Sequence, residues 1–142
     1  GYGVNYSGFE GLTLNYATMD IVTGDSTTEG DVDVIKASYA YGPVTATYSL
    51  LDYDVSSTST AKETTSYALS YTITDDLSVS YGSETHDRAD SANDIEIDGI
   101  SVSYTTGGMT ISAASQSGEN FNHSTSSNLD VDYWALGASF AF

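Results

Sequence analysis

The sequence has 142 residues, no cysteine, and three Lys and Arg against twenty Asp and Glu, which gives a formal net charge of −17. This composition excludes a disulfide framework, and it argues against nucleic acid binding because few cations are present to neutralise phosphates. An aromatic content of 12% argues against a disordered acidic chain. No apolar run is long enough for a transmembrane helix and no secretory signal is present, so we expect a processed chain or a fragment.

The first half of the chain alternates apolar and polar residues with a period of two, which is typical of β-strands. Four strands are expected, at residues 2–6, 12–16, 35–41 and 44–50. Short turns are expected at 7–11 and 42–43, and long polar loops at 23–31 and 52–64. The connections therefore alternate between short and long.

The second half repeats this arrangement with five more strands. They are expected at residues 67–73, 77–81, 100–104, 109–113 and 134–142. Short turns are expected at 74–76 and 105–108, and long loops at 83–94 and 115–128. Ile95 and Ile97 are out of phase with the strand that follows them, so we expect a β-bulge near Gly99.

One face of almost every expected strand is Val, Ile, Leu, Tyr or Ala, and the other is Ser, Thr or small. A soluble sandwich that buries its apolar face would also alternate in this way. However, the Ser and Thr face carries few charges, tyrosines recur near strand ends, and the charges concentrate in the long loops. These features favour an all-β fold, an antiparallel up-and-down transmembrane β-barrel in which the apolar face meets lipid.

The last expected strand has large apolar residues at alternate positions and ends on an aromatic residue. The pattern resembles the C-terminal signal strand of bacterial outer-membrane β-barrels, which closes the barrel and is recognised by the outer-membrane assembly machinery. The resemblance implies that the assembly signal consists of Trp134, Leu136, Phe140 and Phe142.

The whole chain resembles the C-terminal nine strands of a sixteen-stranded general porin of Gram-negative bacteria. Nine strands cannot close an antiparallel barrel in lipid, so residues 1–142 are interpreted as one β-barrel segment that needs the remaining barrel strands. The resemblance implies an outer-membrane porin that contacts the lipid bilayer and lipopolysaccharide, assembles as a homotrimer and passes small polar solutes and ions by diffusion. The constriction loop of general porins lies in their N-terminal half, so it assigns no constriction residues here.

The pore wall is expected to consist of the polar alternates of the strands. The predicted pore-lining residues are Lys36, Ser38, Thr45, Thr47, Ser70, Ser78, Ser80, Glu84, Arg88, Ser101 and Ser103. Among them, Lys36 is the one cation expected in the body of the barrel, while Glu84 and Arg88 are expected in the outer vestibule with His86. Because the loops carry most of the carboxylates, we expect a weak preference for cations.

No catalytic motif is found, so the protein is not expected to be an enzyme. His86 and His123 fall in expected loops without a partner at catalytic spacing. The acidic run from Asp87 to Asp98 lacks the spacing of a calcium loop, so we expect no metal site and no cofactor beyond weak divalent cation binding by the external acidic loops.

Two alternative functions stay open from the sequence. One is a smaller closed outer-membrane β-barrel that acts as an adhesin or anchor, with side chains filling its lumen. The other is a secreted acidic β-sandwich that binds a surface partner. The number of strands distinguishes the smaller barrel from a porin, and dependence on detergent distinguishes the sandwich.

Overall fold

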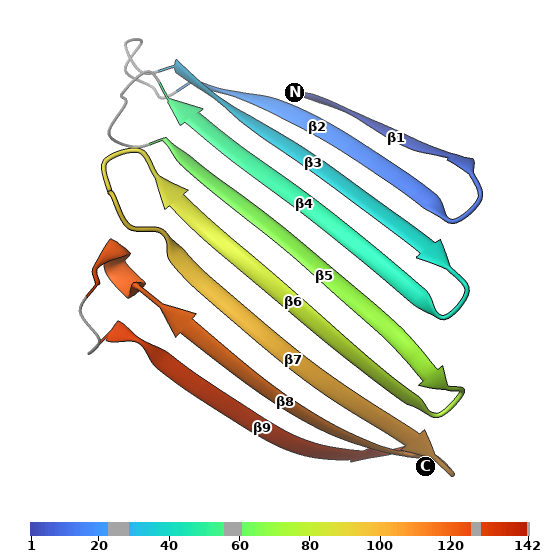
Figure 1. Ribbon diagram of the computed structural model, residues 1–142. Coiled ribbons are helices and arrows are strands. Elements are labelled where there is room, and N and C mark those ends of the chain that lie inside the picture. The colour runs from blue at the N-terminus through green and yellow to red at the C-terminus, as the bar shows by residue number, and fades with distance from the viewer. Residues whose placement is uncertain (23–28, 56–60, 126–128, 142) are drawn as a thin grey trace.

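A computed structural model of the chain describes residues 1–22, 29–55, 61–125 and 129–141. These residues form one all-β sheet of nine antiparallel strands that follow one another in sequence order (Figure 1). The elements are β1 Tyr2–Phe9, β2 Leu12–Val22, β3 Glu29–Tyr41, β4 Val44–Val55, β5 Lys62–Thr74, β6 Leu77–Arg88, β7 Ile95–Thr106, β8 Met109–Glu119, the short 3-10 helix η1 Phe121–His123, and β9 Val131–Phe140. Within the described ranges, no helix is long and apolar enough to cross a membrane.

The connections alternate between short and long, as predicted. The tight turns lie together at one end of the sheet, called here the short-turn end, and the strand ends that the longer connections join lie at the opposite end, called the long-loop end (Figure 1). Gly107 and Gly108 join β7 to β8 with φ angles of 54° and 79°. Two residues with positive φ form the tight hairpin turn whose twist matches the flanking strands, which is why glycine occupies both positions.

The strands extend further toward the long-loop end than the sequence predicted. The predicted loops at 23–31, 52–64 and 83–94 include strand residues at one or both ends, such as Glu29 and Arg88. At the other end, β1 continues to Phe9 through the predicted turn, with an irregular register after Tyr6. The polar composition of these segments did not predict strands, but backbone hydrogen bonds hold a ladder together whatever side chains it carries.

The predicted bulge near Gly99 is wrong. The pairing of β7 with β6 and with β8 runs without a break through Gly99. Ile95 and Ile97 therefore lie on the same face as Ser101, because successive side chains of a regular strand alternate between faces. The prediction failed because it assumed that apolar side chains occupy the same face along the whole length of a strand.

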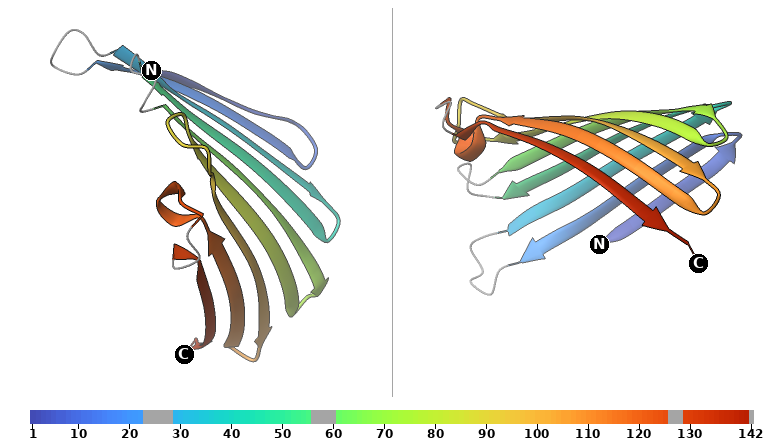
Figure 2. Two further views of the ribbon diagram at one scale, coloured as in Figure 1. Left: turned by 60° about the vertical axis from the view of Figure 1, so that its left-hand side comes forward. Right: turned by 90° about the horizontal axis from the view of Figure 1, so that it is seen from below.

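The sheet is a single curved layer with no second layer packed against it in the described residues (Figure 2). Gly118 is the one buried residue among those described, and large apolar side chains such as Leu69 and Ile100 are about half exposed (50% and 51%). The described residues therefore form no two-layer β-sandwich and enclose no hydrophobic core. β1 and β9 both run from the long-loop end to the short-turn end, and they do not pair with each other.

Candidate functional site

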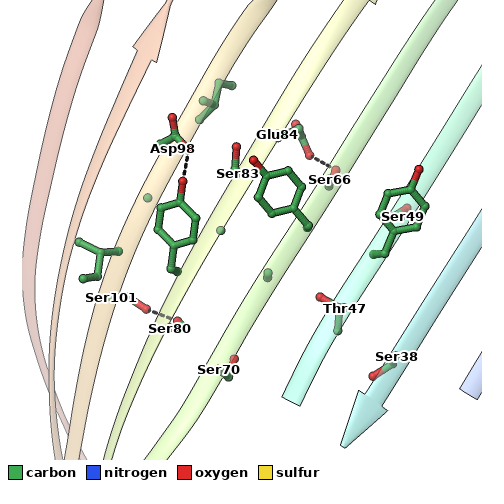
Figure 3. Close-up of a pocket in the computed structure, with 18 of the residues that line it drawn as sticks. Ser38, Thr47, Ser49, Ser66, Ser70, Ser80, Ser83, Glu84, Asp98 and Ser101 are labelled. Carbon is green, nitrogen blue, oxygen red and sulfur yellow. Dashed lines mark hydrogen bonds between the residues drawn. The ribbon is translucent and has the colours of Figure 1, made fainter. Parts of the chain in front are cut away.

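The concave side of the sheet forms an open hollow of about 770 Å³ across β2 to β8. Serine and threonine side chains from β3 to β7 make up much of its lining, and Figure 3 shows them on neighbouring strands. They belong to Ser38, Thr47, Ser49, Ser66, Ser70, Ser80 and Ser101. The concave face is thus the polar one, and the convex face carries the apolar alternates.

The strand register brings the hydroxyl groups into rows across the sheet. Ser80 is the direct cross-strand partner of both Ser70 and Ser101, and the Oγ atoms of Ser80 and Ser101 are 2.7 Å apart. Residues directly opposite one another in neighbouring strands lie on the same face of the sheet. Because the hydroxyl residues recur at every second position of each strand, they form successive rows on that face. A serine hydroxyl both donates and accepts hydrogen bonds, so this wall can bind water and polar solutes without selecting one charge.

Glu84 is the centre of a small polar network on the concave face. The Ser66 hydroxyl donates a hydrogen bond of 2.8 Å to Glu84 Oε2 (Figure 3), and His86 Nε2 lies 2.7 Å from Glu84 Oε1. Thr64 Oγ1 contacts the other ring nitrogen of His86 at 3.0 Å. The network joins β5 to β6 and holds the carboxylate in place on the wall.

The side chains of the predicted pore-lining residues all lie on the concave face of the sheet, by their alternation along the strands. Lys36, Ser38, Thr47, Ser70, Ser80, Glu84 and Ser101 line the hollow. Thr45, Ser78 and Ser103 have the same parity and lie nearer the short-turn end, and Arg88 lines a second hollow at the long-loop end. That these residues line a conducting pore remains a prediction.

Sequence reasoning missed three concave residues and one cation. Ser49, Ser66 and Gln116 also line the hollow, and the parity of Ser70 and Ser80 would have found the first two. The missed cation is Lys62, which begins β5. Lys62 was predicted to lie in a loop because polar residues surround it in the sequence.

On the convex face, tyrosines lie where the apolar residues of the strands are followed, toward the long-loop end, by carboxylates. The Tyr16 hydroxyl donates a hydrogen bond of 2.7 Å to Asp33, and the Tyr81 hydroxyl donates one of 2.5 Å to Asp98 (Figure 3). In both pairs the aspartate lies two residues closer to the long-loop end than the tyrosine's cross-strand partner. A tyrosine with an apolar ring and a hydrogen-bonded hydroxyl suits the boundary between an apolar and a wet region.

The residues of the predicted assembly signal lie at the β9 edge of the sheet. Trp134, Leu136 and Phe140 are on the convex face and are 77%, 71% and 59% exposed. Phe142 lies outside the described residues. The β9 strand pairs with β8 alone, so one of its edges is open for pairing.

The acidic run near the β6–β7 connection does not gather into a metal site. The described residues contain no group of three or more His, Asp, Glu or Cys side chains that could hold a metal ion. In that connection Asp90 pairs with the Arg88 Nε, and His123 donates its Nδ1 hydrogen to the Asn93 carbonyl oxygen at 2.8 Å. Weak divalent cation binding by the acidic loops remains a prediction.

Comparison with known proteins supports the fold. No family model matches the sequence, and no curated protein matches it. One solved structure that is similar is titled "Outer-membrane expressed OmpT of Vibrio cholerae", with a TM-score of 0.54 and 15% sequence identity. The match covers 82% of this chain and 44% of that chain, so the present chain spans less than half the length of the other protein. The fold is thus similar to that of an outer-membrane β-barrel.

Proposed function

We propose that this chain forms part of the wall of a porin, an outer-membrane β-barrel through which small polar solutes and ions diffuse passively. One observation carries the proposal: the sheet has a concave hydroxyl face, a convex apolar face and, in the described residues, no core. Soluble monomers rarely expose a contiguous apolar patch of more than a few hundred Å². Lipid on the convex side and water on the concave side would suit both faces.

The free edges support the view that further strands complete the barrel. A spanning sheet must pair every backbone hydrogen-bonding group, because the hydrocarbon region offers no water as an alternative partner. Since β1 and β9 run in the same direction, an antiparallel closure needs an odd number of additional strands between them. A barrel of the sixteen-stranded general porin type meets this condition.

The alternative functions fit this architecture less well. An eight-stranded barrel with a filled lumen would pair its first and last strands, whereas the nine strands here form an open sheet. A secreted sandwich would need a second layer, which the described residues do not form. That the protein is not an enzyme also remains our proposal, since its sequence carries no catalytic motif.

The distribution of charge supports only a weak preference for cations. Acidic side chains in the long connections would hold a negative potential at the channel mouth, whereas the concave strand residues carry Lys36, Lys62 and Arg88 against Glu84. These wall cations oppose the field of the mouth. We further propose, from the resemblance to general porins, a location in the outer membrane of a Gram-negative bacterium, contact with lipopolysaccharide, delivery by the outer-membrane assembly machinery and a homotrimer.

A pair of neighbouring spin labels tests the two faces. The variants Leu69→Cys and Ser70→Cys place a nitroxide on the convex and concave sides of the same strand. In protein reconstituted into liposomes, we expect the label at 69 to be relaxed by dissolved oxygen, which concentrates in lipid, and the label at 70 by a water-soluble nickel complex. Water contact at position 69 would contradict the barrel, and a lack of ion conductance in planar bilayers would contradict the channel.

A further inference from the structure

The concave face changes its chemistry toward the long-loop end. Between the rows of hydroxyl groups and the long-loop end, two further rows of direct cross-strand partners run across the concave face. One consists of Ala17, Val34, Leu51, Thr64, His86 and Ile95, and the other of Met19, Val32, Tyr53, Lys62 and Arg88. Strands β2 to β4 thus contribute mostly apolar side chains here, whereas β5 and β6 contribute the polar residues Thr64, His86, Lys62 and Arg88.

A second hollow of about 270 Å³ lies in this region, over the ends of β5 to β7. Lys62, His86 and Arg88 line one part of it, and Ile95, Ile97 and Phe121 line another, together with Thr64, Asp87 and His123. Asp87 alternates with His86 and Arg88 along β6, and it is the cross-strand partner of Glu63, so it belongs to the convex face. The hollow therefore combines a cationic strand surface with an apolar wall.

The apolar wall is held in place by the β8–β9 connection. The Phe121 ring lies so close to Gly118 that a Cβ atom there would be 2.5 Å from Phe121 Cε2, which explains a glycine at this position. The Asn93 side-chain amide donates a hydrogen bond of 3.3 Å to the His123 carbonyl oxygen and so ties η1 to the β6–β7 connection. The aromatic side of the hollow is thus built by two connections that contact each other.

The cations of the hollow are unusual in so acidic a chain. Lys62 and Arg88 are two of only three Lys and Arg residues in the sequence, and they are direct cross-strand partners. Like charges in this position repel each other. Arg88 pairs with Asp90 through Nε, so the two Nη groups of its guanidinium can still bind an anion. Lys62 makes no ion pair within the described ranges.

We propose that this hollow binds a small organic anion, with its carboxylate at Lys62 and Arg88 and its apolar body against Ile95, Ile97 and Phe121. A carboxylate would relieve the repulsion between the two cations and match the guanidinium fork. The volume of about 270 Å³ is just below the usual range for ligand pockets, so we expect a ligand no larger than a single ring that bears a carboxylate. The proposal rests on the proposed function only in placing the site inside the mouth of a channel.

Three related probes separate the contributions of charge and ring. The full chain, folded in detergent micelles, is titrated with benzoate, with benzyl alcohol and with acetate, and binding is followed by calorimetry and by the amide resonances of Ile95, Ile97 and Phe121. We expect benzoate to bind most tightly and to shift these resonances, because only benzoate has both a charge and an apolar ring. Benzyl alcohol binding as tightly as benzoate, or no binding of benzoate, would overturn the proposal.

Variants locate the site. Lys62→Gln combined with Arg88→Gln should weaken benzoate binding by about tenfold, as loss of hydrogen bonds to a charged group predicts. Lys36→Gln is the matched control, since Lys36 lies on the same face in the other hollow and should leave binding unchanged. Equal weakening by Lys36→Gln would contradict a local site. Benzoate binding without ion conductance would contradict the channel alone, and conductance without binding would contradict this site alone.

Discussion

The middle of the sheet and its long-loop end have opposite polarity on the same two faces. In the middle, the convex face carries residues such as Leu69 and Val102 and the concave face carries hydroxyl groups such as Ser70 and Ser101. At the long-loop end, the convex face carries carboxylates and the concave face carries aliphatic and cationic side chains. The convex carboxylates of β2 to β6 are Asp20, Glu29, Asp31, Asp33, Asp52, Asp54, Glu63 and Asp87.

Strand periodicity thus does not assign a face to lipid or water by itself. The backbone keeps its alternation through Gly99, yet the apolar side chains move from Ile100 on the convex face to Ile97 on the concave face. An outer surface needs apolar side chains only where it meets hydrocarbon, and beyond that height it meets head groups and water. The Tyr16–Asp33 and Tyr81–Asp98 hydrogen bonds lie where this change occurs.

The largest effect is expected from a charge in the apolar convex band. Leu69→Arg or Val79→Arg should destabilise the folded protein in liposomes by about 2–4 kcal/mol, the cost of a cation near the middle of a bilayer. Glu63→Arg, on the convex face at the long-loop end, should cost much less because we expect that position to lie outside the hydrocarbon region. Urea unfolding followed by the fluorescence of Trp134 measures both. Equal costs at the two heights would show that no apolar band exists.

The terminal strand should matter more for assembly than for conduction. Replacing Phe140 with Ser, or deleting Phe142, should lower the amount of folded protein in the outer membrane several-fold, because this strand is expected to supply the assembly signal and one closing edge. The folded fraction is measured by its heat-modifiable migration on gels. Ser139→Ala, on the opposite face of the same strand, serves as the control. Unchanged folded yield in the Phe140 and Phe142 variants would refute the signal.

A smaller effect is expected at the boundary between the two regions. Tyr81→Phe removes the hydroxyl that donates to Asp98 and should lower stability by about 0.5–1.5 kcal/mol. Tyr67→Phe is the matched control, because Tyr67 lies on the convex face of the neighbouring strand and makes no side-chain hydrogen bond within the described ranges. Denaturation in lipid measures the difference. Similar losses in both variants would mean that the hydrogen bond contributes nothing.

The smallest effect is expected for ion selectivity, and it depends on which face carries the charge. Lys36→Glu on the concave face should raise the preference for cations, whereas Asp33→Lys on the convex face should change it little, although the two changes in charge are equal in size and opposite in sign. The reversal potential under a KCl gradient measures the preference. The shift should grow at low salt, since the Debye length is about 8 Å at 0.15 M and longer in more dilute solution. A larger shift for Asp33→Lys would reverse the assignment of faces.

Much of the architecture could be predicted from local chemistry. Period-two alternation and turn residues such as Gly107 and Gly108 identified nine strands, their order and the alternation of short and long connections. The same alternation placed Ser70, Ser80 and Ser101 on one face, because side-chain direction along a strand depends on the backbone alone. These features need no information about distant residues.

Cross-strand register and curvature decided the rest. The sequence around Lys62 and Arg88 reads as polar loop, and only the pairing of β5 with β6 makes these residues direct partners on the concave face. Ile95 and Ile97 appeared out of phase because the apolar residues of β7 lie on the convex face in the middle of the sheet and on the concave face near the long-loop end. Sequence by itself determined which side chains share a face. The tertiary structure alone decided which neighbours each side chain meets there, because partners on adjacent strands come from distant parts of the chain.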